Sequence, residues 1–89
     1  MAKHVLKTNP IPFVAQNLKQ MIKIIVENED DVLIHTYAGK KRVEYTVYVN
    51  KEDRAKLIGD NEETIMAIRK VLTSWCDRYN FYAVLEVEE

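Results

Sequence analysis

The spacing of apolar residues switches along this chain between the repeat of a strand and the repeat of a helix. This switching limits the possible folds more than any other feature of the sequence. Residues 42–49 alternate strictly, and a period of two predicts a β-strand with one buried face. The apolar positions of this strand are Val43, Tyr45, Val47 and Val49, and the opposite positions are Arg42, Glu44, Thr46 and Tyr48.

Two stripes of apolar residues have the spacing of helices instead. The first follows Pro10 and Pro12, which a first helical turn tolerates, and predicts a helix over residues 12–28 that Asn28 closes in a left-handed conformation. The second predicts a helix over residues 63–79. The stripes consist of Val14, Leu18, Met21, Ile22 and Ile25, and of Ile65, Ile68, Leu72 and Trp75.

A short helix is predicted between the alternating strand and the second stripe. Asn50 is suited to cap its first turn, and Asp53, at the third helical position, is expected to accept from the backbone of the cap. The helix should span residues 51–58 and end at Gly59, because glycine commonly terminates helices.

Residues 32–37 and 81–87 are predicted to be the remaining strands. A hairpin turn at residues 38–41 should join the first two strands, with Gly39 supplying a positive φ. The element order is therefore α-β-β-α-α-β, and the fold class is α+β, with a three-stranded sheet covered on one face by three helices. The predicted core consists of Val14, Leu18, Ile22, Ile25, Val43, Val47, Leu57, Ile65, Ile68, Leu72 and Leu85.

The 89 residues are enough for one domain, which we expect to span residues 10–89 after a flexible segment of residues 1–9. Thirteen basic and fourteen acidic residues give a net charge of −1, which excludes a globally basic nucleic-acid binder. Cys76 is the only cysteine, so no internal disulfide is expected. The first residues lack the apolar run of a signal peptide, and no segment is apolar enough to span a membrane. We therefore expect a cytoplasmic protein that contacts no membrane.

Catalytic signals are scarce in this sequence. There is no set of cysteines and histidines at metal-binding spacing, no H-E-x-x-H motif and no glycine-rich nucleotide loop. The two histidines, His4 and His35, stand far from the cysteine in sequence. We predict that the chain is not an enzyme and requires neither a metal nor a cofactor.

The corner between the last two helices has the most specific pattern in the chain. It reads Ala55-Lys56-Leu57-Ile58-Gly59-Asp60-Asn61-Glu62-Glu63, follows a strand ending at Val49, and precedes Ala67-Ile68-Arg69. This resembles a type II KH domain, most closely the small single-domain bacterial KH proteins (KhpA/YlqC-like), where the stretch is Gly-Lys-Val-Ile-Gly-Lys-x-Gly-Arg followed by Ala-Leu-Arg. The element order is similar over residues 12–88, and the close residue match covers residues 49–72.

The resemblance implies a module that binds single-stranded RNA. In KH domains the G-x-x-G loop clamps the backbone of about four unpaired nucleotides. The glycines allow close approach, and backbone N–H groups and basic side chains hold the phosphates. It also implies a possible homodimer or a complex with another KH-type protein. The candidate contact residues are Ile58, Gly59, Asp60, Asn61 and Glu62 in the loop, Arg54, Lys56 and Arg69 beside it, and Lys40, Lys41 and Arg42 in the hairpin.

The loop departs from the family pattern where phosphate would bind. Glu62 stands in place of the second glycine, Asp60 in place of a lysine and Glu63 in place of an arginine. Carboxylates repel phosphate, so the clamp should be weakened. The degenerate loop leaves an alternative open, namely a protein-interaction or dimerisation module that does not bind RNA. RNA binding remains the favoured function.

Several single features also have simpler interpretations. Gly59 could be only a helix stop, the acidic run only a helix cap, and Lys40–Arg42 only a solvated hairpin tip. Tyr45 could stack on a base, although a core position is favoured, and Trp75 is also expected in the core. Tyr82 and Val84 share a face of the last strand and could contact a partner.

Overall fold

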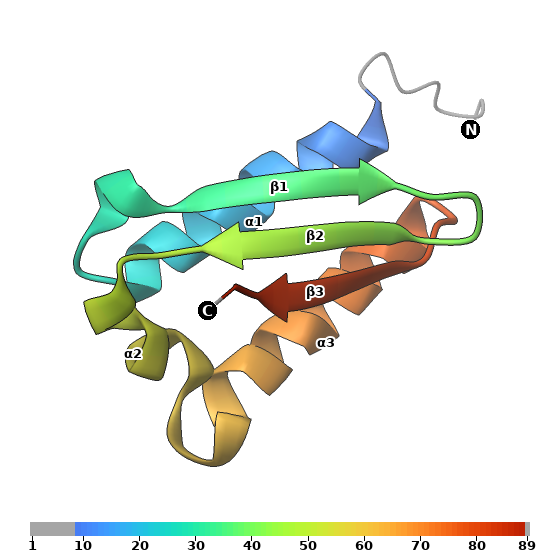
Figure 1. Cartoon of the computed structure of the whole chain (residues 1–89). Helices are drawn as coiled ribbons and strands as arrows, with labels where there is room; N and C mark the ends of the chain where they lie inside the picture. Colours follow the sequence, from blue (N-terminus) through green and yellow to red (C-terminus); the bar gives the residue numbers. More distant parts are fainter. Residues whose placement is uncertain (1–8, 89) are drawn as a thin grey trace.

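The computed structural model describes residues 9–88 of the chain, and it has the predicted α+β architecture (Figure 1). The element order α-β-β-α-α-β is confirmed. The elements are α1 (Pro10–Ile25), β1 (Leu33–Ala38), β2 (Val43–Tyr48), α2 (Arg54–Ile58), α3 (Glu63–Arg78) and β3 (Ala83–Val87). Short 3₁₀ turns precede β1 (Glu29–Asp31), α2 (Lys51–Asp53) and α3 (Asp60–Glu62). Of the predicted flexible segment 1–9, residues 1–8 lie outside the described residues.

The three strands form one mixed sheet in the order β1-β2-β3. β1 pairs antiparallel with β2 across the hairpin, with Leu33 opposite Tyr48 and Ala38 opposite Val43. β2 pairs parallel with β3, because α2 and α3 carry the chain back to the other end of the sheet. Figure 1 shows α1 and α3 behind the sheet, on the same face, as the sequence predicts. The arrangement is compatible with a type II KH fold.

The core between the sheet and the helices confirms the predicted set with one exception. Ile25, the last residue of α1, is only partly buried. The core also contains residues that were not in the predicted set, namely Val26, Val32, Tyr45 and Cys76. Tyr45 has no exposed surface, and its hydroxyl donates a 2.8 Å hydrogen bond to the carbonyl of Ile11. Its interpretation as a core residue is therefore confirmed, whereas Trp75 only packs against the core from a partly buried position.

The structure corrects the predicted ends of α1 and the geometry of the hairpin. α1 begins at Pro10 because the side chain of Asn9 accepts from the N–H of Ile11, and it ends where Val26 adopts an extended backbone. Asn28 has a φ of −96°, so the predicted left-handed closure there is wrong. The positive φ predicted for Gly39 is also wrong. Gly39 supplies space instead, since a Cβ there would lie 3.0 Å from the carbonyl oxygen of Arg42.

β1 has the predicted length but is shifted by one residue, since it begins after Val32 and includes Ala38. β2 and β3 are each two residues shorter than predicted, because Arg42, Val49, Phe81 and Tyr82 lie outside them. Among residues 9–88, no helix is both long and apolar enough to cross a membrane.

Candidate nucleic-acid interface

Gly59 makes the sharp corner between α2 and α3 for two independent reasons. Its φ is 81° and its ψ is 169°, a conformation that side chains disfavour. A Cβ at this position would also meet the side chain of Thr64 and lie 2.8 Å from its backbone nitrogen. Gly59 is therefore a helix stop, as predicted, and it also permits a close approach of two backbone segments.

The next three residues form a tight turn with left-handed backbone. Asn61 has φ 54° and Glu62 has φ 62°. Asparagine tolerates this region, but glutamate is strained there, and glycine would be the default residue. The loop thus keeps a backbone for which a glycine at position 62 would be the natural choice, although the sequence has a glutamate.

The acidic side chains of the loop do not cap α3 through hydrogen bonds. Glu62 occupies the N-cap position, but its side chain makes no capping bond, and Asp60, Glu62 and Glu63 are all exposed. Within residues 9–88, none of the three forms an ion pair at the distances of a salt bridge. Their carboxylates therefore lie in solvent beside the start of α3.

Asp53 anchors this corner to the end of α1. Its side chain is buried, and its two oxygens accept from the backbone N–H groups of Glu27 and Asn28 and from the side-chain amide of Asn28, at 3.0–3.1 Å. Burial by itself would raise the pKa of Asp53. The hydrogen bonds from Asn28 and Glu27, together with the positive charge of Lys56, outweigh burial and hold the pKa below its ordinary value. Asn50 caps the first turn as predicted, but the prediction that Asp53 accepts from that cap is wrong.

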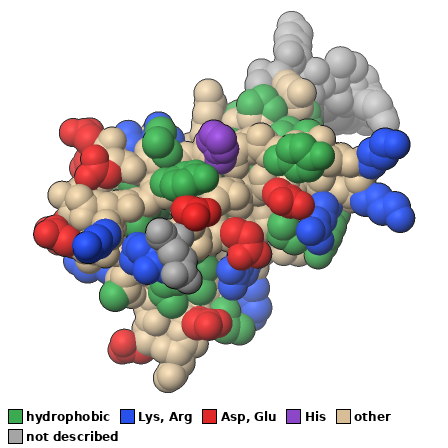
Figure 2. Space-filling view, viewed as in Figure 1, with side chains coloured by type: hydrophobic (Ala, Val, Ile, Leu, Met, Phe, Trp, Pro, Cys, Tyr) green, Lys and Arg blue, Asp and Glu red, His purple; other side chains and the backbone are tan. Residues whose placement is uncertain are grey.

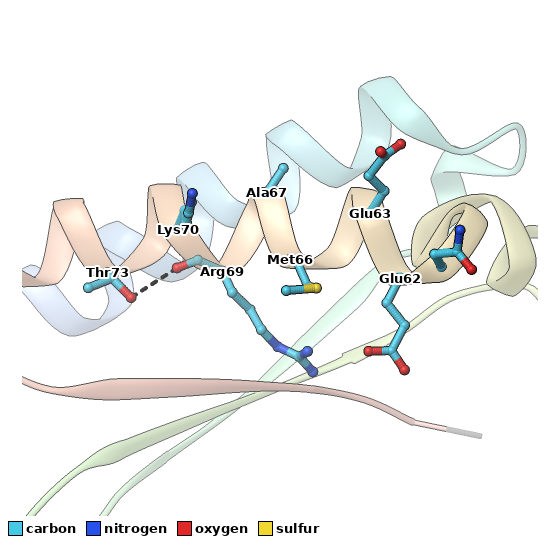
Figure 3. Close-up of a pocket in the computed structure, with 8 residues that line it drawn as sticks. Glu62, Glu63, Met66, Ala67, Arg69, Lys70 and Thr73 are labelled. Atoms are coloured by element: carbon cyan, nitrogen blue, oxygen red, sulfur yellow. Dashed lines mark hydrogen bonds between the residues drawn. The ribbon is translucent and has the colours of Figure 1, made fainter.

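An open cavity of about 770 Å³ adjoins the loop along the exposed face of α3 (Figure 3). Its lining is partly apolar, because Met66 is 56% exposed, and partly basic, because Arg69 and Lys70 contribute to it. The full lining is Asn61, Glu62, Glu63, Met66, Ala67, Arg69, Lys70 and Thr73. A smaller hollow of about 260 Å³ shares Arg69 and Thr73 and continues along residues 82–86 of β3. Together the two hollows form a groove between α3 and β3, which we call the α3–β3 groove.

Arg69 joins the two walls of the α3–β3 groove. Its Nε and Nη2 atoms donate to the carbonyl of Leu85 at 3.2 and 3.0 Å, and the side chain is partly buried. Figure 3 shows the guanidinium reaching down from α3 toward the strands, while Lys70 lies on the upper side of the helix. Arg69 therefore positions β3 against α3 and still leaves positive charge in the groove.

The structure brings only part of the predicted site together. Ile58, Gly59, Asp60, Asn61 and Glu62 form the corner, with Lys56 and Arg54 on α2 beside it. Lys56 forms an exposed 3.2 Å ion pair with Glu27, and Arg54 is partly buried.

The hairpin cluster of Lys40, Lys41 and Arg42 lies elsewhere. Figure 1 places the hairpin at one end of the sheet and the α2–α3 corner at the other. All three side chains are exposed, and Arg42 pairs with Glu44 at 3.3 Å. A separate hollow of about 600 Å³ lies between this hairpin and residues 80–82, where Tyr82 is 62% exposed.

Three residues near the corner were not in the predicted site, namely Asp53, Met66 and Thr73. A signal for the last two exists in the sequence, because positions 62, 66, 69, 70 and 73 share one helical face and Met66 is an apolar residue outside the core stripe. No sequence signal identifies the partners of Asp53, which lie about 25 residues earlier in the chain. Among the described residues, no three His, Cys, Asp or Glu side chains are grouped for metal binding.

Comparison with known proteins agrees with this architecture. The model of the KhpA/KhpB KH-domain family matches residues 15–87. The chain is 36% identical over 72 residues to the RNA-binding protein KhpA of Chlamydia pneumoniae, a match that covers 81% of this chain and 92% of the relative. The KhpA proteins of Chlamydia caviae and Chlamydia trachomatis are 36% and 33% identical over the same shares of both chains. This chain therefore belongs to the KhpA/KhpB family of KH-domain proteins.

Proposed function

We propose that this protein binds single-stranded RNA, with the α2–α3 corner holding the nucleic-acid backbone and the α3–β3 groove receiving the bases. The observation that carries the proposal is the left-handed backbone at position 62. This position is three residues after Gly59, where the second glycine of a G-x-x-G loop stands. The corner keeps the shape of a two-glycine loop, which allows a phosphate backbone to approach closely. The relatives named above are described as RNA-binding proteins, which supports the same function here.

The chemistry of the α3–β3 groove suits unpaired bases. Met66 offers an apolar surface on which a base can lie, and Thr73 offers a hydroxyl. Arg69 and Lys70 supply charge at the side of the groove away from the acidic loop. An unpaired strand that runs from the corner along α3 would therefore move from a phosphate contact toward a basic surface.

The acidic loop sets the expected strength of binding. Asp60, Glu62 and Glu63 are exposed at the place where a phosphate would contact backbone N–H groups. Exposed charges separated by about 4 Å interact by roughly 1–4 kcal/mol, depending on the local dielectric. We therefore expect a dissociation constant in about the micromolar range at low salt, which weakens further as salt is added.

A titration of fluorescently labelled, unstructured RNA of about eight nucleotides tests the proposal, with fluorescence anisotropy as the readout. Lys70→Glu should weaken binding about tenfold and flatten the salt dependence, because it reverses a positive charge that lines the hollow along α3. Lys41→Glu is the matched control, since it makes the same charge change at the far end of the sheet and should have a smaller effect. The double variant Asp60→Lys/Glu62→Gly should bind more tightly than the natural protein.

Two results would contradict the proposal. If the natural protein fails to bind at low salt and only Asp60→Lys/Glu62→Gly binds, the loop has lost its clamp and the protein acts as an interaction module without RNA. If Lys41→Glu weakens binding more than Lys70→Glu, the RNA lies on the hairpin rather than in the α3–β3 groove.

A further inference from the structure

The side chains that line the cavity along α3 divide between two sides of that helix. Figure 3 shows Glu62, Met66 and Arg69 directed toward the side of α3 that faces the strands, whereas Glu63 and Lys70 lie on the upper side. The spacing explains the division, because side chains three and four positions apart share one helical face. The side toward the strands therefore has a carboxylate, a thioether and a guanidinium in a row.

Met66, in the middle of this row, offers an apolar surface to a ligand. It is 56% exposed and lies outside the core. The cavity around it has a volume of about 770 Å³, which is within the range of pockets that hold small ligands. A methionine side chain adapts its shape to a neighbour, and its sulfur packs favourably against aromatic rings. Met66 is therefore suited to contact the flat face of a nucleobase.

The charged groups at the two ends of the row can both form hydrogen bonds with a ligand. Glu62 is exposed and makes no capping bond, and among residues 9–88 no ion pair joins it to Arg69. Arg69 donates to the carbonyl of Leu85 through Nε and Nη2. A guanidinium has more N–H groups than these two bonds use, so Arg69 can also donate to a ligand. The row thus offers an acceptor at one end and a donor at the other.

Attraction of phosphate gives RNA little hold at this end of the cavity. The carboxylates of Glu62 and Glu63 line it, and they repel phosphate. Figure 2 shows acidic and basic side chains interspersed over the visible face of the sheet, with no broad basic surface outside the hairpin. A nucleobase is neutral and carries N–H groups, so it meets a carboxylate on better terms than a phosphate does.

The four bases of RNA differ in what they present to such a row. Guanine has two adjacent donors, N1–H and the N2 amino group, which can bind both oxygens of one carboxylate, and its O6 and N7 acceptors are the usual partners of arginine. Cytosine and adenine each offer a single amino group next to an acceptor nitrogen. Uracil offers two carbonyl oxygens, which a carboxylate repels. Guanine is therefore the base that matches both ends of the row.

We propose that this cavity holds one guanine base of a bound RNA and that Glu62 is the residue that selects it. The inference rests on the proposed RNA-binding function. The guanine lies on Met66, donates to the carboxylate of Glu62 and accepts from Arg69. Glu62 then has two opposing effects, because its charge repels the phosphates of every RNA whereas its oxygens bind guanine alone among the bases through a pair of donors.

Three labelled RNAs test the proposal by fluorescence anisotropy at low salt. The first consists of about eight uridines, the second has one central guanosine, and the third has inosine at that place. Inosine keeps N1–H, O6 and N7 but lacks the N2 amino group. The natural protein should bind the guanosine RNA about tenfold more tightly than the uridine RNA, and the inosine RNA with intermediate affinity.

Glu62→Gln removes the carboxylate and keeps the length of the side chain. It should bind the uridine RNA more tightly than the natural protein does, and its preference for guanosine should fall to about twofold or less. Glu63→Gln is the matched control, because it removes the same charge from the neighbouring residue, whose side chain lies on the other side of α3. It should tighten the binding of all three RNAs alike and keep the tenfold preference. Arg69 stays unchanged in this test because it also holds β3.

The results separate this inference from the proposed function. If none of the three RNAs binds, the RNA-binding function fails, and this inference fails with it. If the natural protein binds the uridine and guanosine RNAs equally, RNA binding stands and the selection of guanine is wrong. The inference is also wrong if the inosine RNA binds as tightly as the guanosine RNA, if the preference survives in Glu62→Gln, or if Glu63→Gln loses it to the same extent.

Discussion

Replacing Glu62 with glycine should stabilise the protein, although the change removes a side chain and adds backbone freedom. Glu62 is exposed and has a φ of 62°, whereas its neighbour Glu63 is the first residue of α3 and has a φ of −63°. Glu63→Gly is therefore a matched control. It makes the same chemical change one position later and removes the same charge from the same loop, but at a residue with ordinary helical geometry.

The expected magnitudes follow from the two φ values. Left-handed backbone costs a residue with a side chain about 1–2 kcal/mol, and glycine loses about 0.5–1 kcal/mol of conformational entropy on folding. Glu62→Gly should thus raise the free energy of unfolding by about 0.5–1 kcal/mol. Glu63→Gly gains no such relief and should lower it by about 0.5–1 kcal/mol. For a domain of this size the melting temperatures of the two variants should differ by about 6–12 °C.

Thermal unfolding followed by circular dichroism measures the difference, and urea unfolding provides the free energies. Equal destabilisation of both variants would refute the reasoning, because it would mean that position 62 has ordinary helical backbone. RNA titrations of the same pair separate charge from shape. Both variants remove one carboxylate, so a larger gain in affinity for Glu62→Gly indicates that the glycine lets the RNA backbone come closer.

Three further predictions concern the buried polar groups. Asp53→Asn should lower the melting temperature at pH 7, and an unchanged melting temperature would mean that the bonds to Asn28 do not hold the corner. Because the pKa of Asp53 is depressed in the folded state, the difference in melting temperature between the variant and the natural protein should close only when the pH falls below about 4. Tyr45→Phe leaves the carbonyl of Ile11 without its donor and should cost about 1–2 kcal/mol in urea unfolding, so a neutral effect would argue against that bond. Burial, with a smaller contribution from Asp77, raises the pKa of Cys76 to about 11, so the free energy of unfolding should fall as the pH rises from about 9 to 11. The native thiol should react slowly with a thiol reagent at pH 8, and rapid reaction would contradict its burial.

Membership of the KhpA/KhpB family confirms the prediction that the chain is a small KH-type protein. The chain departs from the family pattern in the loop after Gly59. There a glutamate occupies left-handed backbone, and three carboxylates surround the corner. Under the proposed RNA-binding function, repulsion of phosphate by these carboxylates should weaken the clamp, and Glu62→Gly should recover part of the affinity.

The sequence by itself determined the order of elements, the buried faces of α1, β2 and α3, and the corner at Gly59. These features depend on local causes: a period of two or 3.6 residues, a cap such as Asn50, and a glycine where the backbone must turn. The predictions that failed were also local but underdetermined, since Asn28 and Gly39 were assigned left-handed conformations from residue type alone, and packing chose other backbone angles.

Only the tertiary structure decided how distant segments meet. Asp53 finds its donors at the end of α1, and Arg69 finds its acceptor on β3, so neither partner can be read from nearby sequence. The separation of the basic hairpin from the Gly59 corner, the α3–β3 groove, and the place of β1 at one side of the described sheet all follow from the fold. The physical reason is the same in each case: these features arise from which elements the core packs together, and not from the conformational preference of any one segment.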